Sequence, residues 1–147
     1  EKIGGLLFLT AFFAVFSRSE GTLCYLSAGH PAGIVLDREN NSVELLRSKM
    51  APIGLSSLLS QTVAEPEVVR LPDRFSFMVA TDSIIELPGA RYAQTYLGEE
   101  KFVELYQKYI QASAEDANAA GFTDYILGET GNLEFEDDCS IIMVFRG

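Results

Sequence analysis

The chain has few of the residues on which several common functional sites depend. Its 147 residues include one histidine, His30, and two cysteines, Cys24 and Cys139. A single histidine excludes a histidine-based zinc cluster, and no Gly-x-Ser-x-Gly elbow accompanies it for a hydrolase triad. The two cysteines share no spacing motif and fall in predicted strands. We therefore expect free thiols packed in the core of a protein from a reducing compartment, the cytoplasm.

Positive charge is also scarce. Lysine and arginine number 11 against 21 acidic residues, which gives a net charge of −10. This balance leaves no basic face for a phosphate backbone, so nucleic-acid binding is disfavoured. The apolar run at 3–16 is too short to span a bilayer and lacks the basic start and cleavage site of a signal peptide. We expect a buried strand there and no membrane segment.

Apolar residues, in contrast, are abundant. They make up 48% of the chain, enough for the core of a single domain over residues 1–147. Apolar patterning and turn signals predict strands at 6–16, 22–27, 33–36, 43–46, 62–71, 74–81 and 139–145. The run at 74–81 has apolar or small residues on both faces, which is typical of a strand buried on both sides.

Between the last two of these strands the apolar pattern becomes helical. Side chains recur at the spacing i, i+3, i+4, i+7 and i+8 of an amphipathic helix, at Phe102, Leu105, Tyr106, Tyr109 and Ile110. Ser113 with Asp116 three residues later predicts the start of a second helix, and Gly128 its C-terminal cap. Strands followed by two helices and a last strand indicate an α+β fold in which helices cover antiparallel sheet.

Acidic residues stand at the ends of two strongly apolar strands. Asp82 follows the strand at 74–81, and Asp137 and Asp138 precede the strand at 139–145. If these strands are neighbours in one sheet, the carboxylates converge at the same edge. Oxygen ligands without cysteine or histidine suit a hard cation, magnesium or manganese.

Each of these positions also has an explanation without a metal. A strand-end aspartate such as Asp82 caps backbone amides, here those of residues 84–85. Asp137 and Asp138 are explained equally well as part of a solvated acidic turn. His30 lies between glycine and proline, so a bend accounts for it without chemistry, and Glu86 reads as a helix-surface carboxylate.

Five segments, in order along the chain, carry a family resemblance. Residues 9–16, 21–31 and 52–55 resemble a "VTAFYGVLD" strand, a "GTLTYANAGHPP" segment and a "PLGL" turn. Residues 79–86 and 137–140 resemble paired "TDG…E" and "DD.T" motifs. Together they resemble the bacterial PPM-type (PP2C-like) serine/threonine phosphatases of the SpoIIE and RsbU group. The resemblance implies a PP2C-like antiparallel β-sandwich flanked by helices, incomplete at the N-terminus, so the chain would be the C-terminal portion of a SpoIIE-like phosphatase domain.

The resemblance also implies a metal site. In the family, carboxylates hold two divalent cations, Mn²⁺ or Mg²⁺, which activate the water that attacks a phosphoserine or phosphothreonine. Carried over residue by residue, Asp82 and Asp137 are metal ligands. Asp138 stands where the family has Asp or Asn and is a further candidate that orients a metal-bound water.

Three departures from the family pattern limit what the chain is expected to do. Ser83 replaces the glycine after the strand-end aspartate, where a side chain is expected to crowd the site. Ser140 replaces a threonine and keeps the hydroxyl. The early Asp-x-x-Gly-His-Gly stretch does not occur, so the two-metal site is only partly encoded. We expect little or no phosphatase activity from this chain alone.

The resemblance implies a role in bacterial signalling. Its expected substrate is a small phosphorylated regulatory protein of the anti-sigma-factor antagonist type, with a sensor or receiver domain preceding the phosphatase. One alternative is a catalytically dead module that keeps the fold and binds a partner protein, which Ser83 favours and the retained Asp82, Asp137 and Asp138 oppose. Another is a sheet-rich ligand-binding domain unrelated to phosphatases. A truncated sheet also predicts self-association through exposed apolar surface.

Overall fold

The structure is a computed structural model of the chain and describes residues 2–3, 6–55, 64–88, 95–132, 134–135 and 137–147. Its strands are β1 Lys2–Ile3, β2 Leu6–Leu7, β3 Ala11–Ser17, β4 Thr22–Ala28, β5 Gly33–Asp37, β6 Val43–Leu46, β7 Glu67–Arg70, β8 Phe75–Ala80 and β9 Ile141–Arg146. Its helices are α1 Gly98–Ser113 and α2 Ala119–Thr130, with 3-10 turns η1 at Asp82–Ile84 and η3 at Ala114–Asp116.

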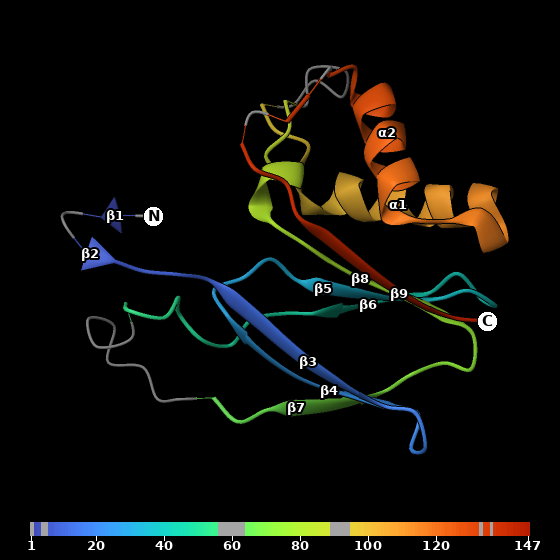
Figure 1. Cartoon of the computed structure of the whole chain (residues 1–147), viewed down its shortest axis with the longest axis horizontal. Helices are drawn as coiled ribbons and strands as arrows, with labels where there is room; N and C mark the ends of the chain where they lie inside the picture. Colours follow the sequence, from blue (N-terminus) through green and yellow to red (C-terminus); the bar gives the residue numbers. More distant parts are fainter. Residues whose placement is uncertain (1, 4–5, 56–63, 89–94, 133, 136) are drawn as a thin grey trace.

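These elements form three layers. The four-stranded sheet has the strand order β6-β5-β8-β9 and the three-stranded sheet has the order β3-β4-β7, while β1 and β2 form a separate pair; neighbouring strands in all of them are antiparallel. Helices α1 and α2 lie over the outer face of the four-stranded sheet, and the three-stranded sheet packs against its other face (Figure 1). The predicted α+β sandwich of antiparallel sheets with helices is confirmed.

Strand β8 lies at the centre of this arrangement, between β5 and β9. Because side chains alternate along a strand, it contributes to two cores. Met78 and Ala80 face the helices, whereas Phe75 and Phe77 face the three-stranded sheet. The prediction that this strand is buried on both sides is therefore confirmed, and both layers of core depend on it.

The first predicted helix is also confirmed. All five of its apolar positions are buried in α1, where they join the core between the helices and the four-stranded sheet. The predicted caps of the second helix are wrong. Ser113 is still helical and makes no side-chain cap, and Asn118 caps α2 instead, accepting a hydrogen bond from the Gly121 amide. Gly128 lies inside α2, which ends at Gly131 with φ 78°.

Several strand boundaries also differ from the predictions. The strand expected from residue 6 begins at Ala11, because residues 6–7 pair with β1 and Leu9 makes its own bridge to Ile53. The strand expected at 62–71 is β7, four residues long, and residues 62–63 lie outside the described part of the chain.

The cysteines are less buried than expected. Cys24 lies in β4, but Cys139 precedes β9, and both are half-buried free thiols. In β4 the inward positions belong to Leu23 and Tyr25, so the alternation of the strand turns Cys24 toward the outer face of its sheet.

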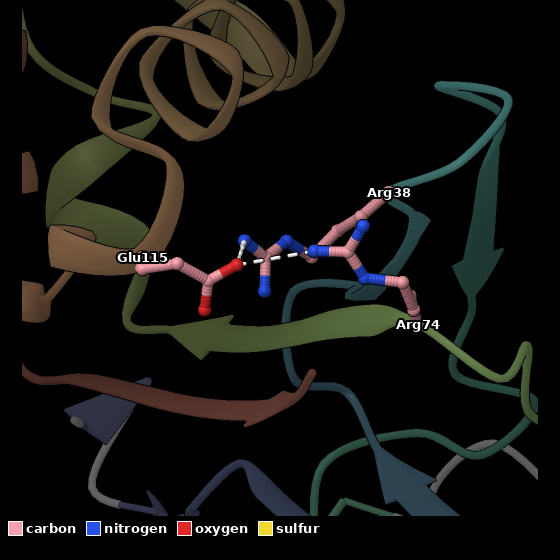
Figure 2. Close-up of polar contacts among 3 residues, drawn as sticks. All are labelled: Arg38, Arg74 and Glu115. Atoms are coloured by element: carbon pink, nitrogen blue, oxygen red, sulfur yellow. Dashed lines mark hydrogen bonds and ion pairs between the residues drawn. The ribbon is translucent and has the colours of Figure 1, made fainter.

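An ion-pair cluster joins the helical layer to the strands at the end of β8 opposite to Asp82. Arg38, which follows β5, and Arg74, which precedes β8, both contact Oε1 of Glu115 in η3, at 3.2 and 3.1 Å (Figure 2). The Arg38 side chain is 8% exposed, so its charge is largely removed from water and benefits from the carboxylate. Within the described residues, no helix is both long enough and apolar enough to span a membrane.

Candidate metal site

The two acidic positions singled out in the sequence lie at one edge of the four-stranded sheet. Strands β8 and β9 pair in a register that places Ala80 opposite Ile141, and the pairing continues with a 3.1 Å hydrogen bond from the Thr81 amide to the Ser140 carbonyl. Asp82 leaves β8 where Asp137 and Asp138 lead into β9. The strands are neighbours, which is the condition under which the sequence placed these carboxylates at one edge.

Asp82 begins the 3-10 turn η1 and is exposed at the surface. Its backbone carbonyl accepts hydrogen bonds from the amides of Ile85 and Glu86, at 2.9 and 3.0 Å. Its carboxylate makes no hydrogen bond to any residue that the structure describes, and the N-cap position of the turn is Thr81. The explanation of Asp82 as a side-chain cap is therefore wrong.

A hydroxyl network ties the two strand ends together. The Thr81 hydroxyl accepts a 3.0 Å hydrogen bond from the Ser140 amide and lies 3.1 Å from the Ser83 hydroxyl. Ser83 is buried and donates to the Asp138 carbonyl at 3.2 Å. The side chain that replaces the family glycine thus bridges β8 and the segment before β9. These contacts fix the backbone from which Asp82 and Asp138 project.

Asp137 and Asp138 are both exposed, as the alternative of a solvated turn also expects. One carboxylate oxygen of Asp137 accepts a 2.8 Å hydrogen bond from the Asp138 amide. Asp137 also lines a 280 Å³ pocket together with Ser83 and Glu86. Glu86 is exposed, in agreement with its prediction as a surface carboxylate. Among the described residues, no three acidic, histidine or cysteine side chains are grouped so that they could hold a metal ion.

His30 lies close to the same edge. Its Nδ1 is 3.2 Å from the Thr10 hydroxyl, and its ring centroid is 6.3 Å from that of Phe12. Burial lowers the pKa of His30, while the negative charge of Asp82 and a hydrogen bond to the Ala80 backbone act in the opposite direction. The bend predicted from its flanking residues is present, with Gly29 at φ 61°.

Sequence reasoning missed two residues that organise this edge, Thr81 and Thr10. Thr81 could have been found, because a threonine between a buried strand and an aspartate is well placed to bond a neighbouring strand end. Thr10 could not, because its contact with His30 depends on the exact register of β3 against β4, in which Ala11 lies opposite Ala28.

Several solved structures share this architecture. The SiaA-PP2C domain of Pseudomonas aeruginosa matches with a TM-score of 0.72 at 19% identity, over 94% of this chain and 51% of that one. The RsbU and RsbW domains of Rv1364c from Mycobacterium tuberculosis match with a TM-score of 0.62 at 19% identity, over 93% and 37%. The phosphatase domain of the cell fate determinant SpoIIE from Bacillus subtilis, presoaked with Mn, matches with a TM-score of 0.60 at 14% identity, over 93% and 56%.

These likenesses define the fold as PP2C-like. The chain spans about half the length of the solved chains that it matches, between 37% and 56% in these three. A family model described as stage II sporulation protein E (SpoIIE) matches residues 1–146, and the chain belongs to that family. Comparison with curated proteins gave no match.

Proposed function

We propose that this chain is part of a metal-dependent protein serine/threonine phosphatase that acts in bacterial signalling. The observation that supports it best is the position of Asp82 beside Asp137 and Asp138 at one sheet edge, in a chain of the SpoIIE family. The proposed substrate is a phosphoserine or phosphothreonine on a small regulatory protein of the anti-sigma-factor antagonist type. The proposed setting is the cytoplasm, with a sensor or receiver domain preceding the phosphatase.

The residue types at this edge suit a hard divalent cation, because carboxylate oxygens are the ligands that such ions prefer, but the described side chains do not by themselves form a complete metal site. We assign Asp82 and Asp137 as ligands of Mn²⁺ or Mg²⁺, and Asp138 as the group that orients a bound water. When bound, such cations lower the pKa of water and neutralise phosphoryl oxygens. The three aspartates at this edge are too few to hold two metal ions, so we expect little hydrolysis from this chain alone.

The experiment that tests the proposal is hydrolysis of an aryl phosphate and of a phosphoserine protein, with and without Mn²⁺, by the protein at its natural length. Asp82→Asn and Asp137→Asn are each expected to lower kcat at least 100-fold, in the range reported for loss of one strong electrostatic stabiliser. Asp73→Asn removes the same charge from an exposed position before β8, at the opposite end of that strand from Asp82, and is expected to leave kcat unchanged. Full activity in both site variants would contradict the assignment.

A second function is a binding module without catalysis, which the buried Ser83 side chain favours. Ser83 bonds the Asp138 carbonyl where the family has glycine. Ser83→Gly separates the two functions: it is expected to raise Mn²⁺-dependent hydrolysis if the side chain crowds an active site. A folded protein that is inactive with every divalent metal, with and without Ser83→Gly, identifies the binding module.

A further inference from the structure

A cavity of about 550 Å³ opens between the two sheets, at the end where the turn from β3 to β4 and the C-terminal end of β9 lie (Figure 1). Its apolar wall comes from both sides of the sandwich: Phe16 and Leu71 from the three-stranded side, and Phe75 and Val144 from the four-stranded side. All four belong to the core between the sheets or pack against it, and the rings of Phe16 and Phe75 are stacked at 6.3 Å. The volume is in the range of small-molecule sites, about 300–1,000 Å³.

Two arginine side chains complete this lining. Arg18 immediately follows β3, and Arg146 is the last residue of β9, on the same face as Val144 because side chains alternate along a strand. Nη1 of Arg146 is 3.9 Å from the position that a Cβ atom on Gly21 would take, so its guanidinium group lies over the turn between β3 and β4. Among the described residues, no acid lines the cavity, although acidic residues outnumber basic ones by 21 to 11 in the chain.

Neither arginine makes an ion pair or a side-chain hydrogen bond in the described part of the chain. The contrast with other arginines is clear, because Arg38, Arg47 and Arg74 each pair with a glutamate. Both guanidinium groups at the cavity are exposed, so water is their present partner and a ligand can replace it without breaking a protein contact.

A second, more polar hollow adjoins the cavity, and Arg18 and Arg146 line both. The acids near the two arginines line only this second hollow. The Asp37 carboxylate there accepts three hydrogen bonds within the turn that follows β5. Glu20 and Asp73 are exposed and make no ion pair with the residues that the structure describes. The positive charge at the cavity is therefore not neutralised from within the chain.

An apolar wall with two unpaired guanidinium groups fits a ligand that has an apolar body and one anionic group. The planar fork of a guanidinium group matches the two oxygens of a carboxylate. We propose that this cavity binds a small organic acid, with its apolar body against Phe16 and Phe75 and its carboxylate on Arg18 and Arg146. Asp82 lies beyond the other end of the six-residue strand β8, roughly 20 Å away, so the inference does not depend on the proposed function.

The test is a titration of two acids, 2-naphthoate and octanoate, and of the matched alcohols, 2-naphthylmethanol and octanol, into the ¹⁵N-labelled protein. The alcohols keep the apolar body and lack the charge. We expect the acids to shift the amide signals of residues 16–21 and 144–146 first, and to bind about 10-fold more tightly than the alcohols. Equal affinity of acid and alcohol, first shifts elsewhere, or no binding of either acid at millimolar concentration would overturn the proposal.

Substitutions separate the charge from the cavity. Arg18→Gln and Arg146→Gln should each weaken acid binding about 3- to 10-fold and leave alcohol binding unchanged, because each removes one partner of the carboxylate. Arg47→Gln removes the same charge from a residue that does not line the cavity and should leave acid binding unchanged. Val144→Phe places a ring in the cavity, keeps both arginines and should weaken binding of all four compounds. Wild-type acid binding in both Arg18→Gln and Arg146→Gln, or equal weakening in Arg47→Gln, refutes the assignment of the arginines.

The same titrations are made on the protein at its natural length, because this chain covers about half of the solved chains that it matches. We expect the acids to bind there with the same preference over the alcohols. Binding that is seen with residues 1–147 and lost at natural length would overturn the proposal, since another part of the protein would then occupy the cavity.

Discussion

Gly29 is the residue at which a single methyl group should disturb both the fold and the candidate site. Its φ of 61° lies in the left-handed region, where a side chain costs about 1–2 kcal/mol. The added Cβ would also meet Pro52, at 2.4 Å from Cγ, 2.5 Å from Cδ and 2.8 Å from the backbone nitrogen. Overpacking of this kind costs about 1–3 kcal/mol. Gly29→Ala is therefore expected to lower the free energy of unfolding by about 2–5 kcal/mol.

Two other glycines provide matched controls. Gly98 has φ 75° but no atom within 4 Å of an added Cβ, so Gly98→Ala should cost only the backbone strain, about 1–2 kcal/mol. Gly128 lies in α2 without positive φ and with the same open space, so Gly128→Ala should stabilise by about 1 kcal/mol.

The assay is urea-induced unfolding followed by circular dichroism. A fourth variant, Gly29→Ala with Pro52→Ala, removes the ring atoms but not the backbone nitrogen and should recover part of the loss. If Gly29→Ala costs no more than Gly98→Ala, the close approach of Gly29 to Pro52 is refuted. Pro52→Ala should restore no more stability to Gly29→Ala than the amount by which Gly29→Ala is less stable than Gly98→Ala. A larger recovery would also contradict the reasoning.

Three further predictions concern the core and the titration of single groups. Phe122 is fully buried against the rings of α1, so Phe122→Ala should cost about 3–5 kcal/mol in urea unfolding, whereas Phe13→Ala, at a ring that is 60% exposed, should cost far less. Burial and the hydrogen bond to Glu67 raise the pKa of Tyr25 from 10.0 to about 12, so the stability that the neutral phenol contributes below pH 10 is lost as the pH rises toward 12. The free energy of unfolding, measured between pH 9 and pH 12, should therefore fall less steeply in Tyr25→Phe than in the wild-type protein. Lys101 and Lys108 lower the pKa of Glu104 from 4.5 to about 2, so its contribution is complete above pH 4.5 and lost as the pH falls toward 2. Because Glu104 is largely solvated, Glu104→Gln should lower the free energy of unfolding by less than about 1 kcal/mol at pH 7. The stabilities of the wild-type protein and of Glu104→Gln should converge as the pH falls, and a difference that is largest below pH 4 would contradict the lowered pKa.

The parts of the fold that the sequence predicted are those that depend on local pattern. Helix α1 was predictable because five apolar residues at helical spacing leave only one face that can be buried. The pairing of β8 with β9 was within reach of the sequence, because a strand buried on both faces belongs inside a sheet and the strand after the helices is also strongly apolar.

The parts that the sequence did not predict depend on contacts between distant residues. Ser113 and Asn118 are both good capping residues, and the choice between them is made by Tyr109. Its hydroxyl donates to the Asn118 carbonyl at 2.9 Å and accepts from the Asn118 amide at 3.1 Å, which fixes the extended backbone that a cap requires. Local pattern alone contains no information on that bond.

The candidate site divides in the same way. The shared edge of Asp82 and Asp137 followed from adjacent strands. The contact of Thr10 with His30 did not, since it depends on the exact register of β3 against β4.

The most direct test of the account is to titrate Mn²⁺ into the ¹⁵N-labelled chain and to follow paramagnetic broadening of its amide signals. We predict that the signals of residues 81–83 and 137–140 broaden first and together, and that Asp82→Asn abolishes this selectivity while Asp73→Asn, at the other end of β8, does not. Broadening that begins elsewhere on this acidic surface, or that affects only one of the two strand ends, would contradict a metal site between β8 and β9.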